Sequence, residues 1–239
     1  MKYLDRTLCT PQENLAGDEA LLDWCEEGSA EEILRFWEPR QHFVVLGYSN
    51  RTRTEVNLES CKSLGITVLR RCSGGGTVLQ GPGCLNYALL LKIHGDSPLT
   101  NIANANAFIM NRNRNALNSL LDGKVLIQGC TDLTLQEVKF SGNSQRRKRH
   151  FLLFHGSFLL NLDFALVEQV LPMPAQQPQY RCRRTHKDFL INLNLPADNI
   201  KEALKRAWSA GEALEEIPEK RVKQLVQEKY ATDAWNFKF

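Results

Sequence analysis

Apolar and polar positions along the chain predict an order of elements in which strands gather in the middle of the sequence. Near-continuous apolar runs at Phe43–Tyr48 and Leu85–Ile93 predict strands that are buried on both faces. Shorter or alternating runs predict further strands at Lys2–Thr7, Ile33–Trp37, Ile66–Arg71, Lys124–Phe140 and Arg149–Leu162. This mixed order indicates an α+β fold, with a central mixed or antiparallel β-sheet flanked by helices, rather than a regular doubly wound sheet.

Helix signals are spread along the chain, between and after the predicted strands. Thr10, Pro11 and Glu13 form the pattern of a capping box with proline in the first turn, which predicts a helix through about Cys25. Helical spacing of apolar residues predicts further helices at Glu55–Leu64, Pro98–Leu121, Leu166–Val170, Asn199–Ser209 and Pro218–Tyr230. The segment Pro172–Arg184 is rich in Pro and Gln, so we expect an extended connector there.

Composition narrows the class of protein. The formal net charge of +3 is too small to indicate a nucleic-acid partner by itself. The chain begins without the apolar run of a signal peptide, and its longest apolar patch is shorter than a membrane span. An odd number of scattered cysteines without a Cys-x-x-Cys pair favours neither a disulfide framework nor a zinc site. These cysteines are Cys9, Cys25, Cys61, Cys72, Cys84, Cys130 and Cys182. We therefore expect a cytoplasmic protein.

A glycine-rich segment follows one of the predicted strands. Residues 70–78 read Arg-Arg-Cys-Ser-Gly-Gly-Gly-Thr-Val. Successive strand residues point to opposite faces, so Arg70 and Arg71 diverge, and Arg71 shares its side with Ser73. The glycines let an anionic ligand approach the backbone N–H groups directly. The spacing matches neither a phosphate-binding Walker loop nor a dinucleotide fingerprint. Taken alone, the segment is more typical of a flexible loop between strands.

A second motif combines a lysine with a glycine that would let a ligand approach the backbone. Residues 139–145 read Lys-Phe-Ser-Gly-Asn-Ser-Gln. Strand alternation predicts that Lys139 and Ser141 lie on one face, opposite Val138 and Phe140. A fixed ammonium there would stabilise negative charge on a phosphate or acyl oxygen. A lysine that protects an edge strand from aggregation is the alternative.

Together these segments resemble a known family. The order Arg-Arg-Cys-Ser-Gly-Gly-Gly-Thr-Val, Thr-Asp-Leu, Lys-Phe-Ser-Gly-Asn-Ser-Gln-Arg and His-Gly-Ser resembles the catalytic domain of the lipoate–protein ligase A family, within the biotin/lipoate ligase superfamily. The resemblance covers most of residues 1–239 and implies one catalytic domain without a separate accessory C-terminal domain. It also implies an enzyme that forms lipoyl-AMP from lipoate, ATP and Mg²⁺ and then transfers the lipoyl group to a lysine of a lipoyl domain.

The resemblance assigns roles to individual residues. Lys139 would be the principal catalytic residue, Arg71 and Ser73 would contact the acyl-phosphate region, and Asp132 would lie near Mg²⁺. The other positions that the resemblance marks as binding the acyl group or nucleotide are Gly74, Gly75, Gly76, Asn86, Ser141, Gly142, Arg146 and His155. A turn-capping aspartate is the lesser alternative for Asp132, whereas His155 is equally typical of a structural histidine.

Two departures from the family pattern leave an alternative open. Gln80-Gly81-Pro82-Gly83 stands where many ligases have a His-Asp pair. Without an accessory domain, such an enzyme would adenylate alone, use a separate accessory protein, or perform transfer only. Octanoyltransferases of the same superfamily use no ATP and take the acyl group from acyl carrier protein onto a cysteine. Cys130, nine residues before Lys139, is the candidate nucleophile, although a small buried loop residue is an equal explanation. We expect the ligase activity first and the transferase second.

The basic run Arg146–His150 has three explanations. It is typical of a solvated hairpin tip, and it would also form a positive rim for an acidic lipoyl domain or the nucleotide. The absence of interleaved aromatic residues speaks against single-stranded nucleic acid. The sequence leaves the acid open between lipoate, octanoate and another medium-chain acyl group.

Overall fold

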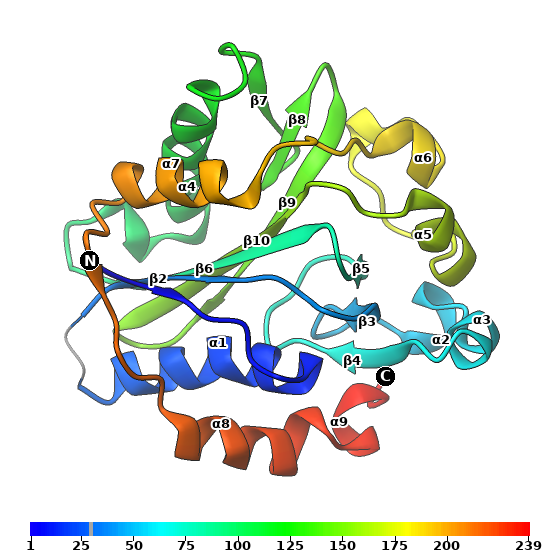
Figure 1. The fold of residues 1–239 in the computed structure, drawn as a ribbon, viewed down its shortest axis with the longest axis horizontal. Helices are drawn as coiled ribbons and strands as arrows, with labels where there is room; N and C mark the ends of the chain where they lie inside the picture. The colour runs from blue at the N-terminus through cyan, green and yellow to red at the C-terminus, as the bar shows by residue number, and fades with distance from the viewer. Residues whose placement is uncertain (29–30) are drawn as a thin grey trace.

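The centre of the molecule is an eight-stranded mixed sheet, seen in a computed structural model that describes residues 1–28 and 31–239 (Figure 1). The strand order is β11-β1-β2-β6-β10-β9-β8-β7. β1 runs parallel to β2 and β11, and every other pairing in this sheet is antiparallel. The expected mixed sheet is confirmed. The strands are β1 (Lys2–Asp5), β2 (Ile33–Trp37), β6 (Cys84–Lys92), β7 (Val125–Gln128), β8 (Asp132–Leu135), β9 (Val138–Arg147), β10 (Phe151–Leu159) and β11 (Glu212–Ala213).

A second, three-stranded sheet carries the glycine-rich segment. β3 (Phe43–Leu46) lies between β4 (Thr67–Arg70), which is parallel to it, and β5 (Val78–Gln80), which is antiparallel. The glycine segment joins β4 to β5. β5 escaped the sequence analysis because three residues are too few to show an alternating pattern.

Helices cover both faces of the large sheet. α1 (Pro11–Glu26) and α8 (Glu219–Leu225) lie on one side, and α4 (Ile102–Asn118) and α7 (Ala197–Ala207) lie on the other (Figure 1). The shorter elements are α2 (Thr52–Glu55), α3 (Leu58–Ser63), α5 (Phe164–Val170), α6 (His186–Phe189), α9 (Asp233–Asn236), a π-helical turn (Val226–Tyr230) and the 3₁₀ turns Pro98–Thr100 and Gln179–Arg181. No helix of the described residues is long and apolar enough to cross a membrane.

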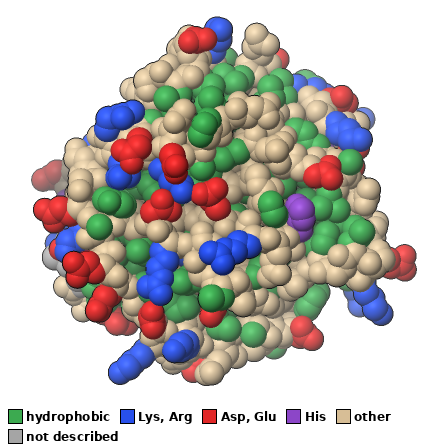
Figure 2. Space-filling view, in the orientation of Figure 1, with side chains coloured by type: hydrophobic (Ala, Val, Ile, Leu, Met, Phe, Trp, Pro, Cys, Tyr) green, Lys and Arg blue, Asp and Glu red, His purple; other side chains and the backbone are tan. Residues whose placement is uncertain are grey.

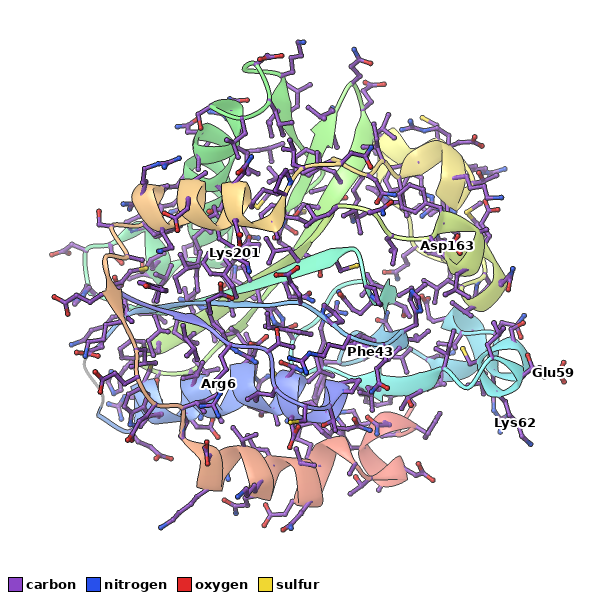
Figure 3. All side chains as sticks on the ribbon, in the orientation of Figure 1. Arg6, Phe43, Glu59, Lys62, Asp163 and Lys201 are labelled. Atoms are coloured by element: carbon purple, nitrogen blue, oxygen red, sulfur yellow. The ribbon has the colours of Figure 1, made fainter. Side chains whose placement is uncertain are left out.

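The core has two layers because side chains alternate along the central strands. On β10, Phe151 and Leu153 pack toward α1, whereas Leu152, Phe154 and Phe158 pack toward α4 and α7. The small sheet adds its own residues, including Phe43 (Figure 3), to the α1 layer. On the face shown in Figure 2, charges of both signs are interspersed. Lys201, labelled in Figure 3, forms ion pairs with Asp5, Glu38 and Asp198.

Most helix predictions are confirmed, with one exception in the first half of the chain. The capping box of α1 forms as expected, with the Thr10 side chain bonded to the Glu13 N–H and the Glu13 carboxylate bonded to the Thr10 N–H. The helix predicted at 55–64 forms as α3, but its predicted start is wrong, because Glu55 ends the separate helix α2. Val56 adopts an extended backbone and is buried in a core cluster, and the Asn57 side chain caps a new helix at Ser60.

The strand predicted over 124–140 is also wrong, because this stretch is two strands and the beginning of a third. Turns at Gly129–Thr131 and at Gln136–Glu137 separate them, and both Gln136 and Glu137 have positive φ. Neither Gln nor Glu is a typical turn residue, so the apolar pattern concealed this second turn. β9 extends through Arg147, which leaves only Lys148–His150 at the hairpin tip.

Candidate functional site

A polar strip crosses the face of the large sheet that looks toward α1 and the small sheet. Strand register places one row of it on four adjacent strands, β8, β9, β10 and β6, at Asp132, Gly142, Ser157 and Asn86. The neighbouring row contains Ser144 and His155. Residues in register point to the same face, so the sheet brings together positions that are far apart in the sequence. Arg146 is on this face too, opposite Leu153, and is exposed.

A β-bulge sets the position of Lys139. The register between β8 and β9 shifts between Leu133 and Thr134, which turns Lys139 toward Asp132. Its Nζ lies 2.7 Å from Asp132 Oδ1, and the Tyr180 hydroxyl donates to Asp132 Oδ2 at 2.7 Å. A Cβ on Gly142 would lie 2.8 Å from Lys139 Nζ, so the absence of a side chain there makes room for the ammonium.

The bulge also overturns one prediction. Ser141 pairs with Leu133, is buried, and accepts a hydrogen bond from Asn143 on the α4 side of the sheet. The expectation that Lys139 and Ser141 share a face is therefore wrong, because one extra residue in β9 reverses the alternation that follows it. A role for Ser141 in ligand binding would have to come from the opposite face.

The two adjacent arginines diverge as expected. Arg70 is fully buried and donates to the carbonyl oxygens of Gly47, Tyr48 and Asn50, so it organises backbone. Arg71 turns back on its own loop, where Nε donates to Ser73 Oγ at 3.1 Å and an Nη donates to the Gly76 carbonyl at 2.9 Å. Burial lowers the pKa of Arg71 to about 10, so the guanidinium is still charged at neutral pH.

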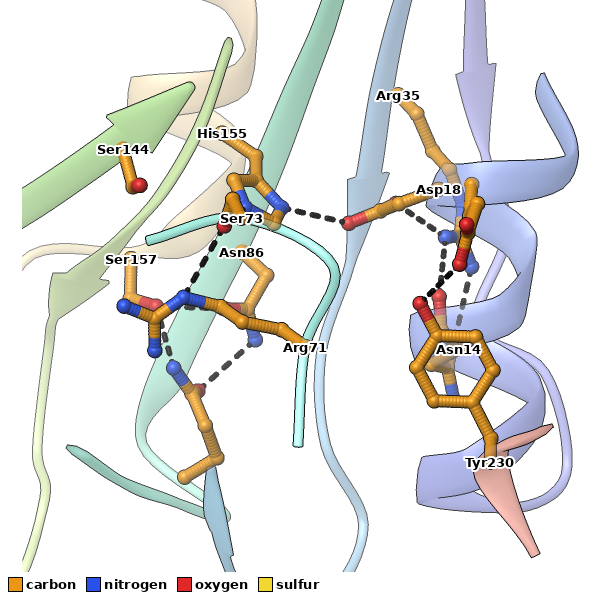
Figure 4. Close-up of polar contacts among 12 residues, drawn as sticks. Asn14, Asp18, Arg35, Arg71, Ser73, Asn86, Ser144, His155, Ser157 and Tyr230 are labelled. Atoms are coloured by element: carbon orange, nitrogen blue, oxygen red, sulfur yellow. Dashed lines mark hydrogen bonds and ion pairs between the residues drawn. The ribbon is translucent and has the colours of Figure 1, made fainter. Parts of the chain in front are cut away.

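Ser73 begins a chain of buried polar groups (Figure 4). Its Oγ lies 2.6 Å from His155 Nε2, and His155 Nδ1 lies 3.2 Å from Asp18 Oδ2. Arg35 pairs with the other Asp18 oxygen and also donates to Asn14. Burial acts to raise the pKa of Asp18, but the charge of Arg35 and the hydrogen bond from His155 outweigh it and hold that pKa below its ordinary value.

Asp18 and Arg35 were missed by the sequence analysis. One signal was available: Asn14 and Asp18 lie four residues apart, so they share one side of α1. Both side chains are buried there with apolar neighbours. Arg35 lies in the middle of a strand that is otherwise apolar. Because the two charged residues lie on different elements, the sequence alone does not show that they form a pair.

Three amide and hydroxyl side chains close a ring beside this chain. Gln80 Nε2 donates to Ser157 Oγ, Ser157 Oγ donates to Asn86 Oδ1 at 2.6 Å, and Asn86 Nδ2 donates to Gln80 Oε1 at 3.1 Å. Gln80, which departs from the family pattern, thus fixes the orientation of Asn86. The ring ties β5 to the polar strip of the large sheet.

The glycine loop lies directly over the second row of the strip. Ser144 Oγ donates to the Gly74 carbonyl at 2.9 Å, and a Cβ on Gly75 would lie 3.6 Å from Ser144 Oγ. Gly75 has a φ of +88°, which favours glycine, and Gly75 and Gly76 are exposed. The two motifs of the sequence therefore meet in one site.

The cysteines divide sharply by burial. Cys25, Cys61, Cys72 and Cys84 are buried, and burial raises the pKa of Cys25, Cys72 and Cys84 to about 12, which keeps these thiols protonated. The exposed cysteines are Cys9, Cys130 and Cys182. Cys130 lies in the turn that leads into β8, two residues before Asp132, and is the exposed cysteine next to the Asp132–Lys139 pair.

The donors at this site do not fit Mg²⁺ in the arrangement observed. Both oxygens of Asp132 are engaged, one by Lys139 and one by Tyr180. Within residues 1–28 and 31–239, no three His, Cys, Asp or Glu side chains cluster as metal ligands do. The metal role of Asp132 stays a prediction.

Comparison with known proteins identifies the family. A family model described as the lipoyl protein ligase A/B catalytic domain matches residues 10–221. The chain belongs to this family. Octanoyltransferase LipM of Anoxybacillus flavithermus is 26% identical over 99% of this chain and 98% of its own length. Lipoate-protein ligase A subunit 1 of Thermoplasma acidophilum is 25% identical over 93% of this chain and 90% of its own length.

Solved structures agree with the family fold. A lipoate-protein ligase A bound with ATP superimposes with a TM-score of 0.82 at 24% identity, covering 99% of both chains. A bi-partite lipoate protein ligase from T. acidophilum, described with its E2 lipoyl domain, gives a TM-score of 0.79 at 25% identity, covering 99% of this chain and 96% of its own. The expected ligase-like catalytic fold is confirmed.

Proposed function

We propose that this enzyme transfers an octanoyl group from a carrier-bound thioester to a lysine of a lipoyl domain without using ATP. The observation that carries the proposal is the position of Cys130, an exposed thiol two residues from the carboxylate that holds Lys139. Relatives named octanoyltransferase, matched over nearly their whole length, support it. Octanoyl transfer, the second expectation from the sequence, is therefore proposed ahead of ATP-dependent ligation, the first expectation.

The reaction divides into two acyl transfers. The Cys130 thiolate attacks the carbonyl of the octanoyl thioester, the donor thiolate leaves and takes up a proton, and an octanoyl thioester forms on Cys130. The amine of the acceptor lysine then attacks this thioester, and the Cys130 thiolate leaves. Each attack creates an oxyanion, and in this proposal the Lys139 ammonium, which Asp132 holds, stabilises it.

ATP-dependent lipoate ligation is the second candidate. It is favoured by the T. acidophilum relative, which is named as one subunit of a ligase and so gives a precedent for a separate accessory protein. Arg71, Lys139 and the loop N–H groups would then contact the phosphate and carbonyl oxygens of an acyl-adenylate. For this activity, Arg71 would have to release the loop carbonyls that it now binds.

A transfer assay with and without ATP distinguishes the two activities. Purified enzyme, octanoyl acyl carrier protein and a lipoyl domain are incubated without ATP, and the lipoyl domain is weighed by mass spectrometry. We expect octanoylation, its loss in Cys130→Ser, and its retention in Cys9→Ser and Cys182→Ser, which change the other exposed thiols. Modification that requires ATP and free acid, and that survives in Cys130→Ser, would establish ligation instead.

A further inference from the structure

We propose that Ser73 and His155 relay the proton that the acceptor lysine must lose before it attacks the acyl group. This inference rests on the proposed function for the acyl group and its acceptor. The chain Ser73–His155–Asp18 reaches from beneath the glycine loop to a buried carboxylate on α1 (Figure 4). Nothing in the two acyl transfers above uses it.

The hydrogen bonds fix the direction of the relay. Asp18 is an acceptor only, so His155 donates from Nδ1 and its Nε2 is left to accept. The proton between Nε2 and Ser73 Oγ therefore belongs to the hydroxyl. Arg35 is buried behind Asp18 and keeps that carboxylate ionised, so positive charge that appears on His155 is stabilised.

An acceptor lysine needs such a base. An alkyl ammonium has no lone pair, and lysine in water is almost fully protonated at neutral pH. Lys139 does not meet this need because its Nζ is bound to Asp132 as an ion pair. Of the ionisable groups that the structure describes on the polar strip, His155 is the one whose ring nitrogen accepts a hydrogen bond directed from the loop side.

The geometry places the relay close to the acyl carbonyl. His155 is in register with Ser144 on β9, and Gly142, which contacts the Lys139 ammonium, lies two residues along the same strand. Two residues of a strand span about 7 Å. A thioester whose oxygen faces Lys139 thus has its carbon within reach of an amine beside Ser73.

The proton transfers balance without a further reactant. Before the attack, one proton of the acceptor ammonium passes to Ser73 Oγ while the Ser73 proton passes to His155 Nε2, and His155 then releases this proton to solvent. The neutral amine attacks the acyl carbon, the C–S bond breaks, and the Cys130 thiolate leaves. The second proton that the nitrogen loses as the amide forms passes to the departing thiolate or to solvent, which restores the starting state of the relay.

Access to Ser73 requires the glycine loop to shift, because Ser73 is 1% exposed. A Cβ on Gly74 or Gly76 would meet no atom of the described residues within 4 Å, so these two positions face open space. The loop is held by the bonds from Arg71 and Ser144 to its carbonyl oxygens, by the Tyr48 N–H on the Ser73 carbonyl, and by Asn50 on the Thr77 hydroxyl. Displacement of Arg71 by an incoming acyl carrier would remove the largest share of these bonds and let the loop shift.

A comparison of two nucleophiles tests whether Ser73 and His155 relay a proton or have only a structural role. Octanoyl-enzyme is prepared from wild type, His155→Gln, Ser73→Ala and the control His94→Gln, an exposed histidine far from the strip. Each is mixed with either lipoyl domain or hydroxylamine, which is uncharged at neutral pH and needs no base. Decay of the acyl-enzyme is followed by mass spectrometry in a single turnover.

We expect His155→Gln and Ser73→Ala to lose about 100-fold or more in transfer to lysine while reacting with hydroxylamine at the rate of wild type. Equal losses with both nucleophiles, or undiminished transfer to lysine, would overturn the relay. If wild type forms no octanoyl-enzyme, the proposed function fails, and the same comparison is made with octanoyl-adenylate supplied as the donor. The relay and the proposed function are thus judged separately.

Discussion

Individual residues hold the Lys139 ammonium in place, and one of them acts by having no side chain. Asp132 binds the ammonium, Tyr180 binds Asp132, and Gly142 leaves the space that the ammonium fills. Burial and the neighbouring carboxylate raise the pKa of Tyr180, so its hydroxyl remains a donor to Asp132 at all ordinary pH values. The position of this charge is therefore determined by the sheet and not by the lysine itself.

Gly142→Ala tests this arrangement at a single methyl group. The added Cβ would lie 2.8 Å from Lys139 Nζ and 2.9 Å from Cε, so the flexible lysine moves away from Asp132. We expect octanoyl transfer to fall by about 100-fold, because a displaced charge no longer stabilises the oxyanion, while the melting temperature changes little. Gly95→Ala, where a Cβ meets nothing within 4 Å, is the control. Transfer at the wild-type rate in Gly142→Ala would contradict the assigned role of Lys139.

Asp18→Asn tests the buried charges behind His155. The change leaves Arg35 without its counter-charge in the interior, and we expect a loss of about 3–5 kcal/mol in the free energy of unfolding, measured with urea. The folded pKa of Asp18 lies below its unfolded value, so its contribution is present above the unfolded pKa and is lost as pH falls toward the folded one. The variant should therefore lose less stability than wild type below about pH 4. Identical acid profiles for the two proteins would argue against this ion pair.

At the scale of elements, the segment between β4 and β5 connects the small sheet to the site. Arg70, the last residue of β4, bonds backbone carbonyls of the β3–α2 connection and of Trp235 and Asn236, and Asn236 in turn accepts from the Arg70 N–H. Arg71, the first residue of the segment, bonds the glycine loop itself. Two adjacent arginines thus hold different parts of the backbone, one the β3–α2 connection and one the glycine loop.

Parallel Arg→Lys substitutions test this division. Lysine keeps the charge but lacks the planar fork that reaches several carbonyl groups at once. We expect Arg70→Lys to destabilise the protein by about 2–3 kcal/mol and to speed amide exchange in β3, β4 and β5. Arg71→Lys should keep the fold and reduce transfer. The division is contradicted if Arg71→Lys lowers stability as much as Arg70→Lys does.

Local patterns predicted those elements whose signal lies within a few residues. The capping box of α1, the apolar run of β6 and the strand β4 before the glycine segment are of this kind. The bulge that separates Lys139 from Ser141 could not be predicted, because it depends on how β8 and β9 align. The Asp18–Arg35 pair could not be predicted either, since it forms only when α1 packs on β2 and β10. Motifs identified the family, and the register of the sheet decided which of their residues face one another.

In the molecule as a whole, the two faces of the large sheet differ in the side chains that they carry. The face toward α4 and α7 is filled with apolar side chains, together with the buried Tyr87–Asn113–Trp208 bonds. The opposite face combines an apolar region under α1 with the polar strip under the glycine loop. Changes on the first face should affect stability and leave the acyl chemistry of folded protein intact.

Octanoyl transfer through Cys130 requires an acyl-enzyme. The enzyme is incubated with octanoyl acyl carrier protein in the absence of ATP and of lipoyl domain, quenched in acid, and mapped by peptide mass spectrometry. We expect one octanoyl group, labile to hydroxylamine, on the peptide that contains Cys130. Acylation of Cys9 or Cys182 instead, or no acyl-enzyme while lipoyl domain is modified only with ATP, would contradict it.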